Sequence, residues 1–483
     1  MSAAELTRGQ RAARNLLGLL VGTVGEGALQ FLFVVLASRY LGPENFGFWG
    51  FSSALIGYLL VVAGFGLPQI VVREIAKMPD DTGRIFGSAM GLRLLLGLVL
   101  CVAVSGVLPF AELSADRRTT IFLLSLALLV MPFDLAPFFD AHQQSRWDAI
   151  FRLAARTISI GFLGIFIWTQ RALTLPVVAF TSLVFLVFNV GFAWSGTKWL
   201  GLILRPRLVL SEMRQMFKLA LLIFWAQAMS EIYIHTNLIL LGFFSTDRET
   251  GFYAVADKIL LAILTLKGIL YRLLIPLLSE VAHDHDRLIK RLEIVIPLLA
   301  QITVPIAVAA ILVADPVLEM VFGTAYSPAI GPFRILTGYI IFTGVGSIFG
   351  TTLFATGRQR QYSLSIAVGS LTNLLLCFAL IPLLGAVGAA VSSATAEIVV
   401  LTVSFLYFRR DFRPTFFPSL VRTLVAGVAM ATAYSAMPFE GTFAFVGKLL
   451  VGGVAYGGVL RVLGELSPAK IETLRRLFRL PKD

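Results

Sequence analysis

Charged side chains are scarce in this sequence. Asp, Glu, Lys and Arg together make up 14% of the 483 residues, whereas 57% are hydrophobic. Soluble globular chains carry about 25% charged residues. The shortage leaves too little polar surface to keep a folded chain of this length in water, so it excludes the soluble enzyme classes and favours a membrane protein.

Cysteine and long polar segments are also lacking. The two cysteines, Cys101 and Cys377, both lie inside hydrophobic runs. Such a pair cannot provide the disulfide framework that stabilises small secreted domains. The segments between hydrophobic runs are all short, which leaves no room for an inserted soluble domain.

Long hydrophobic runs fill most of the chain instead. A membrane-spanning helix needs roughly 20 mainly apolar residues, because the hydrocarbon layer is about 30 Å thick and each helical residue advances about 1.5 Å. The sequence therefore predicts an all-α polytopic membrane protein with about fourteen spans, with twelve as the alternative. The predicted spans are residues 15–38, 46–72, 85–110, 119–140, 148–169, 175–197, 219–243, 252–280, 292–313, 332–356, 363–383, 388–408, 420–437 and 443–463.

The distribution of Lys and Arg predicts the orientation. If the N-terminus is cytoplasmic, the cytoplasmic segments hold about 25 cations and the opposite loops about 5. Cytoplasmic loops carry such an excess of positive charge, so both termini are expected inside, in the cytoplasmic (inner) membrane of a bacterium. Cations placed in these loops do not indicate nucleic-acid binding.

A weak internal repeat divides the chain, with an offset of about 204 residues. Gly47-Phe48-Trp49 in the first half matches Gly251-Phe252-Tyr253 in the second. Because each half would hold an even number of spans, the halves would be related by a two-fold axis along the membrane normal. The expected organisation is two lobes of about six helices, residues 1–210 and 211–410, then two C-terminal helices and a basic tail in residues 411–483.

Distinctive motifs follow the first span. They are ASRYLGPENFG at 37–47, GFGLP at 64–68 and VREIA at 72–76, with ATGR at 355–358 in the second half. In these motifs the chain resembles the polysaccharide-export flippases, the Wzx-type proteins of the multidrug/oligosaccharidyl-lipid/polysaccharide exporter superfamily. The resemblance extends in pattern over about residues 14–410.

The resemblance implies a two-lobed fold with a central cavity. It also implies that the chain moves an oligosaccharide carried on polyprenyl diphosphate across the inner membrane, for the biosynthesis of a surface polysaccharide such as O-antigen. The implied partners are this lipid-linked oligosaccharide, the membrane lipids, and a polysaccharide polymerase or other proteins of the same pathway. No bond is broken when a lipid is moved, so neither a cofactor nor catalytic residues are expected.

Ionisable residues inside the hydrophobic spans are the candidate functional residues, because charge at bilayer depth is costly. The predicted substrate-binding residues lie on the seventh and eighth spans and are Tyr233, His235, Asn237, Lys258, Lys267 and Arg272. We expect the cations among them to face the cavity and contact the diphosphate. The alternative is a fixed ion pair between Glu231 and Lys267 that joins the two helices.

Carboxylates in the spans are candidates for ion coupling. Glu26 and Glu231 occupy nearly equivalent positions in the two repeats, and Glu397 is central in the twelfth span. A second cluster of charges lies at similar depth on the third to fifth spans, and it consists of Arg93, Asp134, Arg152 and Arg156. Its members are expected to neutralise one another, and a place in the vestibule of the cavity is the alternative.

Three other functions compete with the flippase. A cation-coupled multidrug exporter of the same fold would have a more acidic pocket. A membrane enzyme would need a large loop or catalytic carboxylates at the surface, and the sequence has no such arrangement. A purely structural subunit would not explain charges inside the spans. The residues 283–286, His-Asp-His-Asp, are of metal-ligand types but lie in a turn, so no metal site is predicted.

Overall fold

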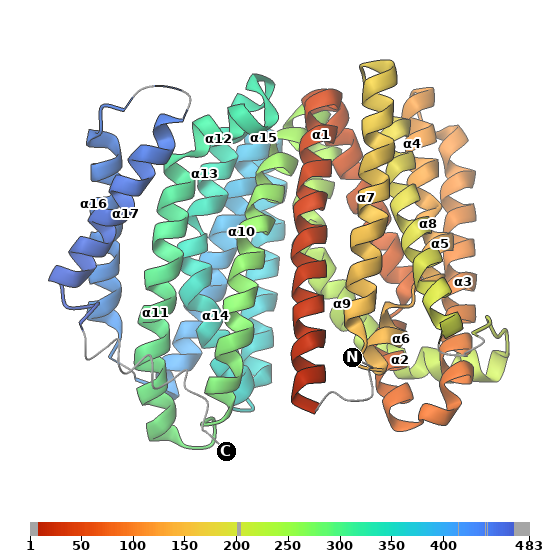
Figure 1. Ribbon diagram of the computed structural model, residues 1–483, viewed down its shortest axis with the longest axis horizontal. Coiled ribbons are helices and arrows are strands. Elements are labelled where there is room, and N and C mark those ends of the chain that lie inside the picture. The colour runs from red at the N-terminus through yellow and green to blue at the C-terminus, as the bar shows by residue number, and fades with distance from the viewer. Residues whose placement is uncertain (1–7, 200–203, 414, 440, 442, 468–483) are drawn as a thin grey trace. The chain divides into compact units, whose positions relative to one another are not determined.

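The computed structural model describes residues 8–199, 204–413, 415–439, 441 and 443–467, and within them every side chain except those of 8–21, 198–199, 226, 230, 232–234 and 265–276. The secondary structure of these described residues is entirely helical (Figure 1). The predicted all-α fold is therefore confirmed.

The contacts within the chain define two compact units, Met1–Gly251 and Phe252–Asp483. The α-helices of the first unit are α1 (Arg8–Gly64), α2 (Leu67–Lys77), α3 (Thr82–Val107), α4 (Ala115–Ser125), α5 (Ala127–Val130), α6 (Ala136–Ala141), α7 (Ser145–Gln170), α8 (Leu175–Trp199) and α9 (Leu210–Phe244). Its short 3₁₀ helices are η1 (Pro79–Asp81), η2 (Leu108–Phe110) and η3 (Met131–Phe133). Helix α1 packs against α7 and α9, and α8 packs against α4 and α7.

The second unit begins inside α10 (Asp247–Ser279), whose first residues belong to the first unit. Its other helices are α11 (His285–Leu312), α12 (Ala314–Phe322), η4 (Thr324–Ala329), α13 (Ile330–Gly338), α14 (Ile340–Ala355), α15 (Gln359–Asp411), α16 (Phe417–Ala436) and α17 (Ala444–Val462). Helix α9 thus packs with the first unit. The division into lobes at residues 210 and 410 stays a prediction.

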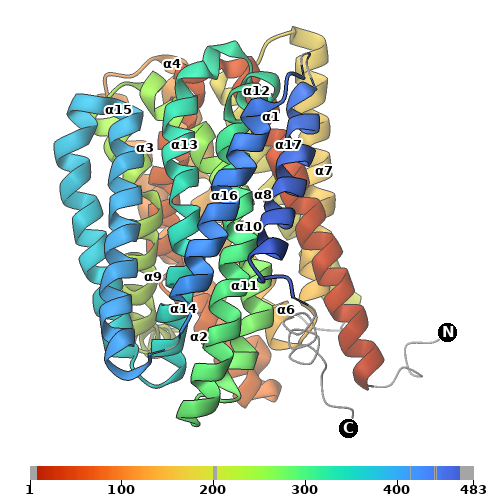
Figure 2. The same cartoon turned by 90° about the vertical axis from the view of Figure 1, so that its left-hand side faces the viewer.

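A buried carboxylate joins the last two helices to the rest of the second unit. Gly464, with φ +77°, ends α17 and turns the chain back, so that Glu465 lies 3% exposed between α11 and α16. Glu465 accepts hydrogen bonds from Ser419 Oγ (2.6 Å), Gln301 Nε2 (3.1 Å) and Arg422 Nη1 (3.0 Å). These bonds connect α11, α16 and the end of α17, and Figures 1 and 2 show α16 and α17 side by side.

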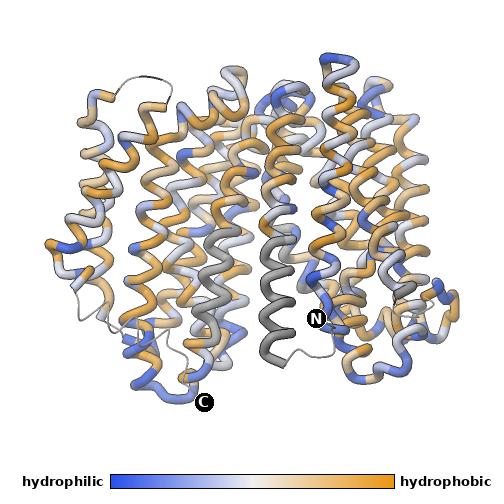
Figure 3. The backbone as a smooth tube through the Cα atoms, in the orientation of Figure 1, coloured by the Kyte–Doolittle hydropathy of each residue, from blue (hydrophilic) through white to orange (hydrophobic). Residues whose placement is uncertain are grey.

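The helices are long and hydrophobic enough to cross a membrane. Within the described residues, ten segments meet this criterion, and Figure 3 shows hydrophobic residues along most of the helical length and hydrophilic residues mainly at turns. Two of the ten, at α1 and α15, are each interrupted by a glycine with non-helical angles, Gly42 (φ 73°) and Gly385 (φ 54°). Both interruptions fall in predicted turns. The chain is a polytopic membrane protein, and the total of fourteen spans stays a prediction.

Gly47 and Gly251, which the predicted repeat pairs, each lie against a backbone carbonyl group near the other glycine. A Cβ atom on Gly47 would overlap the carbonyl oxygen of Asp247, and one on Gly251 would overlap that of Pro43. Pro43 and Asp247 are also one predicted repeat offset apart, and the repeat itself stays a prediction. Only glycine fits this close approach of α1 to the first turns of α10.

Replacing Glu465 by Ala should lower the free energy of unfolding by roughly 3 kcal/mol, because it leaves buried hydrogen-bond donors and an arginine without their carboxylate. Thermal unfolding of the purified protein in detergent measures the change. Asp286→Ala is the matched control, since Asp286 is an exposed carboxylate on α11. Equal unfolding midpoints for the two variants would contradict the role given to Glu465.

Candidate functional site

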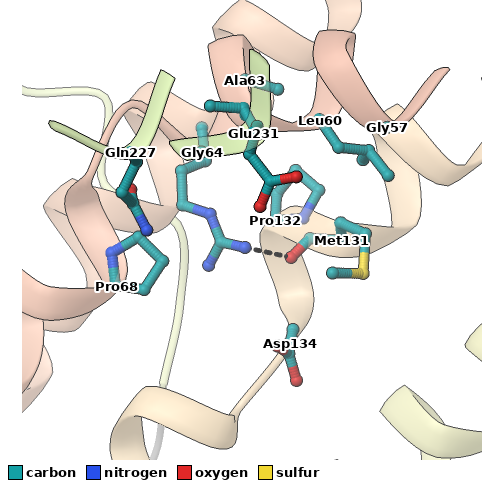
Figure 4. Close-up of a pocket in the computed structure, with 12 residues that line it drawn as sticks. Gly57, Leu60, Ala63, Gly64, Pro68, Met131, Pro132, Asp134, Gln227 and Glu231 are labelled. Atoms are coloured by element: carbon teal, nitrogen blue, oxygen red, sulfur yellow. Dashed lines mark hydrogen bonds between the residues drawn. The ribbon is translucent and has the colours of Figure 1, made fainter. Parts of the chain in front are cut away.

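A cavity of about 330 Å³ lies within the first unit, at two interruptions of its helices (Figure 4). It is lined by Gly57, Leu60, Val61, Ala63, Gly64, Pro68, Arg93, Met131, Pro132, Asp134, Gln227 and Glu231. We call it the Arg93 cavity. It brings together three residues that the sequence singled out, namely Arg93, Asp134 and Glu231. The first two belong to the predicted charge cluster, and the third is a predicted coupling residue.

The first interruption lies between α1 and α2, within the GFGLP motif. Phe65 (φ 47°) and Gly66 (φ 68°) both adopt left-handed angles, which are rare for a bulky residue such as phenylalanine. The Phe65 ring is held between the rings of Phe217 and Phe224 on α9, with centroids 4.3 and 4.4 Å away. This stacking fixes the break, and Gly64 and Pro68 on either side of it line the cavity.

The second interruption divides the predicted span 119–140. The segment consists of α4, α5, η3 and α6, with Asp134 and Leu135 outside any helix. Pro132 and Pro137 explain the break, because proline lacks the N–H that continues a helix. Asp134 Oδ1 accepts a hydrogen bond from the backbone N–H of Ala136 (3.2 Å), the first residue of α6.

Two side chains satisfy the carbonyl groups that this break exposes. Arg93 Nη2 donates to the Met131 carbonyl at 2.6 Å, as the dashed line in Figure 4 marks, and Trp194 Nε1 donates to the Phe133 carbonyl at 2.9 Å. Arg93 is 7% exposed. Inside a bilayer an unpaired carbonyl is costly, so these two donors stabilise the irregular backbone that borders the cavity.

Helix α9 supplies the opposite wall of the cavity through Gln227 and Glu231. Glu231 Oε2 lies 3.3 Å from His235 Nε2, one helical turn further along. The ring of Tyr58 on α1 packs edge-on to the His235 ring, and the Tyr58 hydroxyl lies 3.3 Å from Thr236 Oγ1. Glu231 and His235 thus lie together on α9, and the residues around His235 pack on α1.

The two other arginines of the predicted charge cluster, Arg152 and Arg156, form separate ion pairs. Arg156 Nε lies 3.4 Å from Glu26 Oε1, and the Arg156 guanidinium lies over the Phe185 ring at 3.6 Å. Arg152 Nε donates to Asp148 Oδ2 at 2.8 Å. The predicted cluster is therefore divided in the described structure, with Arg152 and Arg156 each paired to a different carboxylate. The roles of its members stay predictions.

The remaining predicted site residues do not appear in the described lining of the Arg93 cavity. The side chains of Tyr233, Lys267 and Arg272 lie outside the described residues. Asn237 on α9 is 4% exposed. Lys258 and Glu397 belong to the second unit and are half-buried.

Sequence reasoning missed several residues of this site. Trp194, Tyr58 and Gln227 carry no charge, so the search for ionisable residues inside the spans passed over them. The two prolines near Asp134 were the available signal for the broken helix, because proline in a helical run ends or kinks it. The cavity combines one arginine, two carboxylates, an amide and a backbone carbonyl, which can solvate a polar group or exchange a proton or cation within the membrane.

Interrupted helices that enclose charged side chains within hydrophobic spans are typical of membrane transporters. The chain belongs to the polysaccharide biosynthesis protein family, whose family model matches residues 35–331. The predicted resemblance to polysaccharide-export flippases is confirmed.

Individual relatives agree with this membership. The chain is 21% identical over 419 residues to a putative O-antigen transporter of Escherichia coli K12, covering 82% of this chain and 97% of the relative. It is 22% identical over 409 residues to a probable low-salt glycan biosynthesis flippase, Agl15, of Haloferax volcanii, and the match covers 83% of this chain and 84% of the relative. Among solved structures, the lipid II flippase MurJ in an inward closed conformation superimposes with a TM-score of 0.72 at 15% identity, covering 92% of this chain and 98% of that one.

Glu26→Gln should destabilise the protein by roughly 3 kcal/mol, because it leaves the largely buried Arg156 guanidinium without its carboxylate. The double variant Glu26→Gln/Arg156→Met removes the uncompensated charge and should recover most of the unfolding midpoint in detergent. Transport by the double variant distinguishes the two roles of Glu26. We expect transport to recover with stability, and a stable double variant without transport would instead assign Glu26 to ion coupling.

Proposed function

We propose that this chain is a transporter that moves a polyprenyl-diphosphate-linked oligosaccharide from the cytoplasmic to the outer side of the cytoplasmic membrane, for the biosynthesis of a surface polysaccharide. The relatives named as an O-antigen transporter and a glycan flippase support this proposal over most of their length. The mechanism we propose is alternating access, in which the substrate site opens to one side of the membrane at a time.

The observation that carries the proposal is the Arg93 cavity. Non-helical backbone at membrane depth is tolerated only where it is buried in protein or lines a water-filled cavity. At this cavity two such breaks lie beside three charged groups: Arg93 of α3, Asp134 of the segment between α5 and α6, and Glu231 of α9. A transporter needs polar groups of this kind within the hydrocarbon layer, where charge is otherwise costly, and this arrangement supplies them.

A cation-coupled exporter of small molecules is the second candidate, and one observation favours it. The Arg93 cavity holds two carboxylates, Asp134 and Glu231, against one arginine. This acidic balance suits a proton or metal cation better than a diphosphate. In the flippase proposal the cavity therefore serves coupling, and the diphosphate is bound by Lys267 and Arg272.

For the orientation, we propose that both termini are cytoplasmic. Single cysteines at Ser114 and Thr246 should then react with an impermeant thiol reagent added to intact cells, whereas cysteines at Asp80 and Gln359 should react only after permeabilisation. All four residues are exposed, so their access differs by membrane side alone. The native cysteines are buried and give a low background. The reverse labelling pattern would overturn the orientation.

The function is tested in cells from which this chain has been deleted. These cells should accumulate lipid-linked oligosaccharide and lose surface polysaccharide, and the wild-type chain should restore both. Lys267→Ala and Arg272→Ala should each restore less than about half of the polysaccharide at normal protein level, because each removes a cation from the anionic headgroup's route.

The control variant is Lys290→Ala, in an exposed position on α11, and it should restore fully. Full restoration by both Lys267→Ala and Arg272→Ala would remove these residues from the site. Unchanged polysaccharide in the deleted cells, together with increased retention of cationic dyes, would favour the exporter.

A further inference from the structure

A second pocket lies in the first unit beside the turn at Gly42, which interrupts α1. Its volume is about 720 Å³, within the range of small-molecule sites. It is lined by Glu44, Phe48, Phe51, Leu113, Arg117, Gly242, Phe243, Ser245, Thr246, Asp247 and Arg248. We call it the Arg117 pocket. Its lining comes from α1, α4, the end of α9 and the first turn of α10.

Arg117 is held rigidly at the wall of this pocket. Its Nη2 lies 2.7 Å from Asp247 Oδ2 and 3.5 Å from Glu44 Oε1, and its guanidinium lies over the Phe48 ring at 4.6 Å. The side chain of Arg117 is 25% exposed, whereas that of Glu44 is 70% exposed. A guanidinium carries five N–H donors, so donors beyond those directed at the two carboxylates can meet a ligand.

Aromatic rings form another part of the wall. The rings of Phe51 and Phe243 pack edge to face with centroids 5.3 Å apart, and Phe243 is 64% exposed. Gly242 makes this possible, because a Cβ there would overlap the Phe51 ring. The pocket therefore offers flat hydrophobic surface next to fixed hydrogen-bonding groups.

The charges of the pocket restrict the ligand. Arg117 and Arg248 balance Glu44 and Asp247, so the lining is neutral in sum. A diphosphate would meet two carboxylates, and a lipid chain would replace water around charged groups with hydrocarbon, which is costly. A neutral polyhydroxyl ligand suits both parts of the wall, since its hydroxyls can bond the charged groups and its C–H faces can cover the phenylalanine rings.

We propose that the Arg117 pocket is a saccharide-binding subsite that takes neutral sugar units of the transported substrate. The proposal rests on the proposed function for the identity of the sugar. In the proposed orientation this subsite lies on the outer side, where it receives the sugar chain while the diphosphate is still within the membrane. Sugar recognition at this pocket is then separate from the binding of the diphosphate.

The test uses the full-length protein in proteoliposomes with one added cysteine, Ser245→Cys, in the lining of the pocket. Cys101 and Cys377 are buried, so a maleimide reports on position 245. The probe is the water-soluble oligosaccharide released by mild acid from the lipid-linked oligosaccharide of the same cells. This probe lacks the diphosphate and the lipid. It should slow the labelling in a saturable way.

Two further substitutions are made in the Ser245→Cys background. Glu44→Gln should raise the concentration for half-protection at least about fivefold, because it weakens a charge-assisted hydrogen bond to the sugar. Glu112→Gln should leave this concentration unchanged, since Glu112 is an exposed carboxylate of the neighbouring segment and does not line the pocket.

Labelling that the saccharide does not slow would overturn the subsite, as would protection that Glu44→Gln does not weaken. Protection by added lipid alone would show that hydrocarbon occupies the pocket, and would also overturn it.

Movement of the intact lipid-linked oligosaccharide is measured with the same protein. If it moves while position 245 is not protected, the subsite fails and the proposed function stands. If the protein moves no lipid-linked oligosaccharide at all, the proposed function itself fails.

Discussion

A backbone carbonyl or N–H that leaves the helical ladder inside a membrane must find a partner in the protein, because hydrocarbon offers none. The first unit depends on this constraint. Its α4–α6 segment breaks at Met131–Leu135, and the side chains of Arg93 and Trp194 hydrogen-bond to two of the carbonyl groups nearby. Without these donors the break would be unstable, and without the break the cavity would lose the wall formed by Met131, Pro132 and Asp134.

Buried charged groups likewise need partners within the protein. Arg156 is paired with Glu26 and packs on an aromatic ring, and Glu465 collects three donors between α11, α16 and the end of α17. A buried charge without such partners would be strongly destabilising. Charges of this kind therefore have a structural explanation, whereas Asp134 and Glu231 face a cavity where water, a proton or a cation can approach. Asp134 and Glu231 are therefore the residues of the described structure at which a role in transport is best tested.

The class of fold was predictable because it follows from composition and helix length. A chain with so few charges and so many hydrophobic runs has few alternatives to an α-helical membrane protein, and the predicted turns contain the glycines, Gly42 and Gly385, that interrupt α1 and α15. Gly47 and Gly251, which the sequence singled out, both lie at close backbone approaches, and the repeat itself stays a prediction.

The site was predicted less completely. Intramembrane charge pointed to Arg93, Asp134 and Glu231 as individual residues, but the assignment of partners depends on helix rotation, which a period of 3.6 residues in nearly uniform hydrophobic runs does not fix. Sequence reasoning consequently grouped Arg156 with Asp134, whereas the structure pairs it with Glu26. Trp194 and Tyr58 contribute through single hydrogen-bonding groups on hydrophobic rings, and nothing in their sequence context distinguishes them from packing residues.

We propose that this chain alone moves a lipid-linked saccharide between leaflets. The most direct measurement uses the purified protein in liposomes that contain a polyprenyl-diphosphate oligosaccharide with a fluorescent group on the sugar, together with an impermeant quencher added outside. The quencher should remove nearly all of the fluorescence from vesicles that contain the protein, and only the outer leaflet's share from protein-free vesicles. If only the outer leaflet's share is lost from both kinds of vesicle, the chain does not move this lipid by itself.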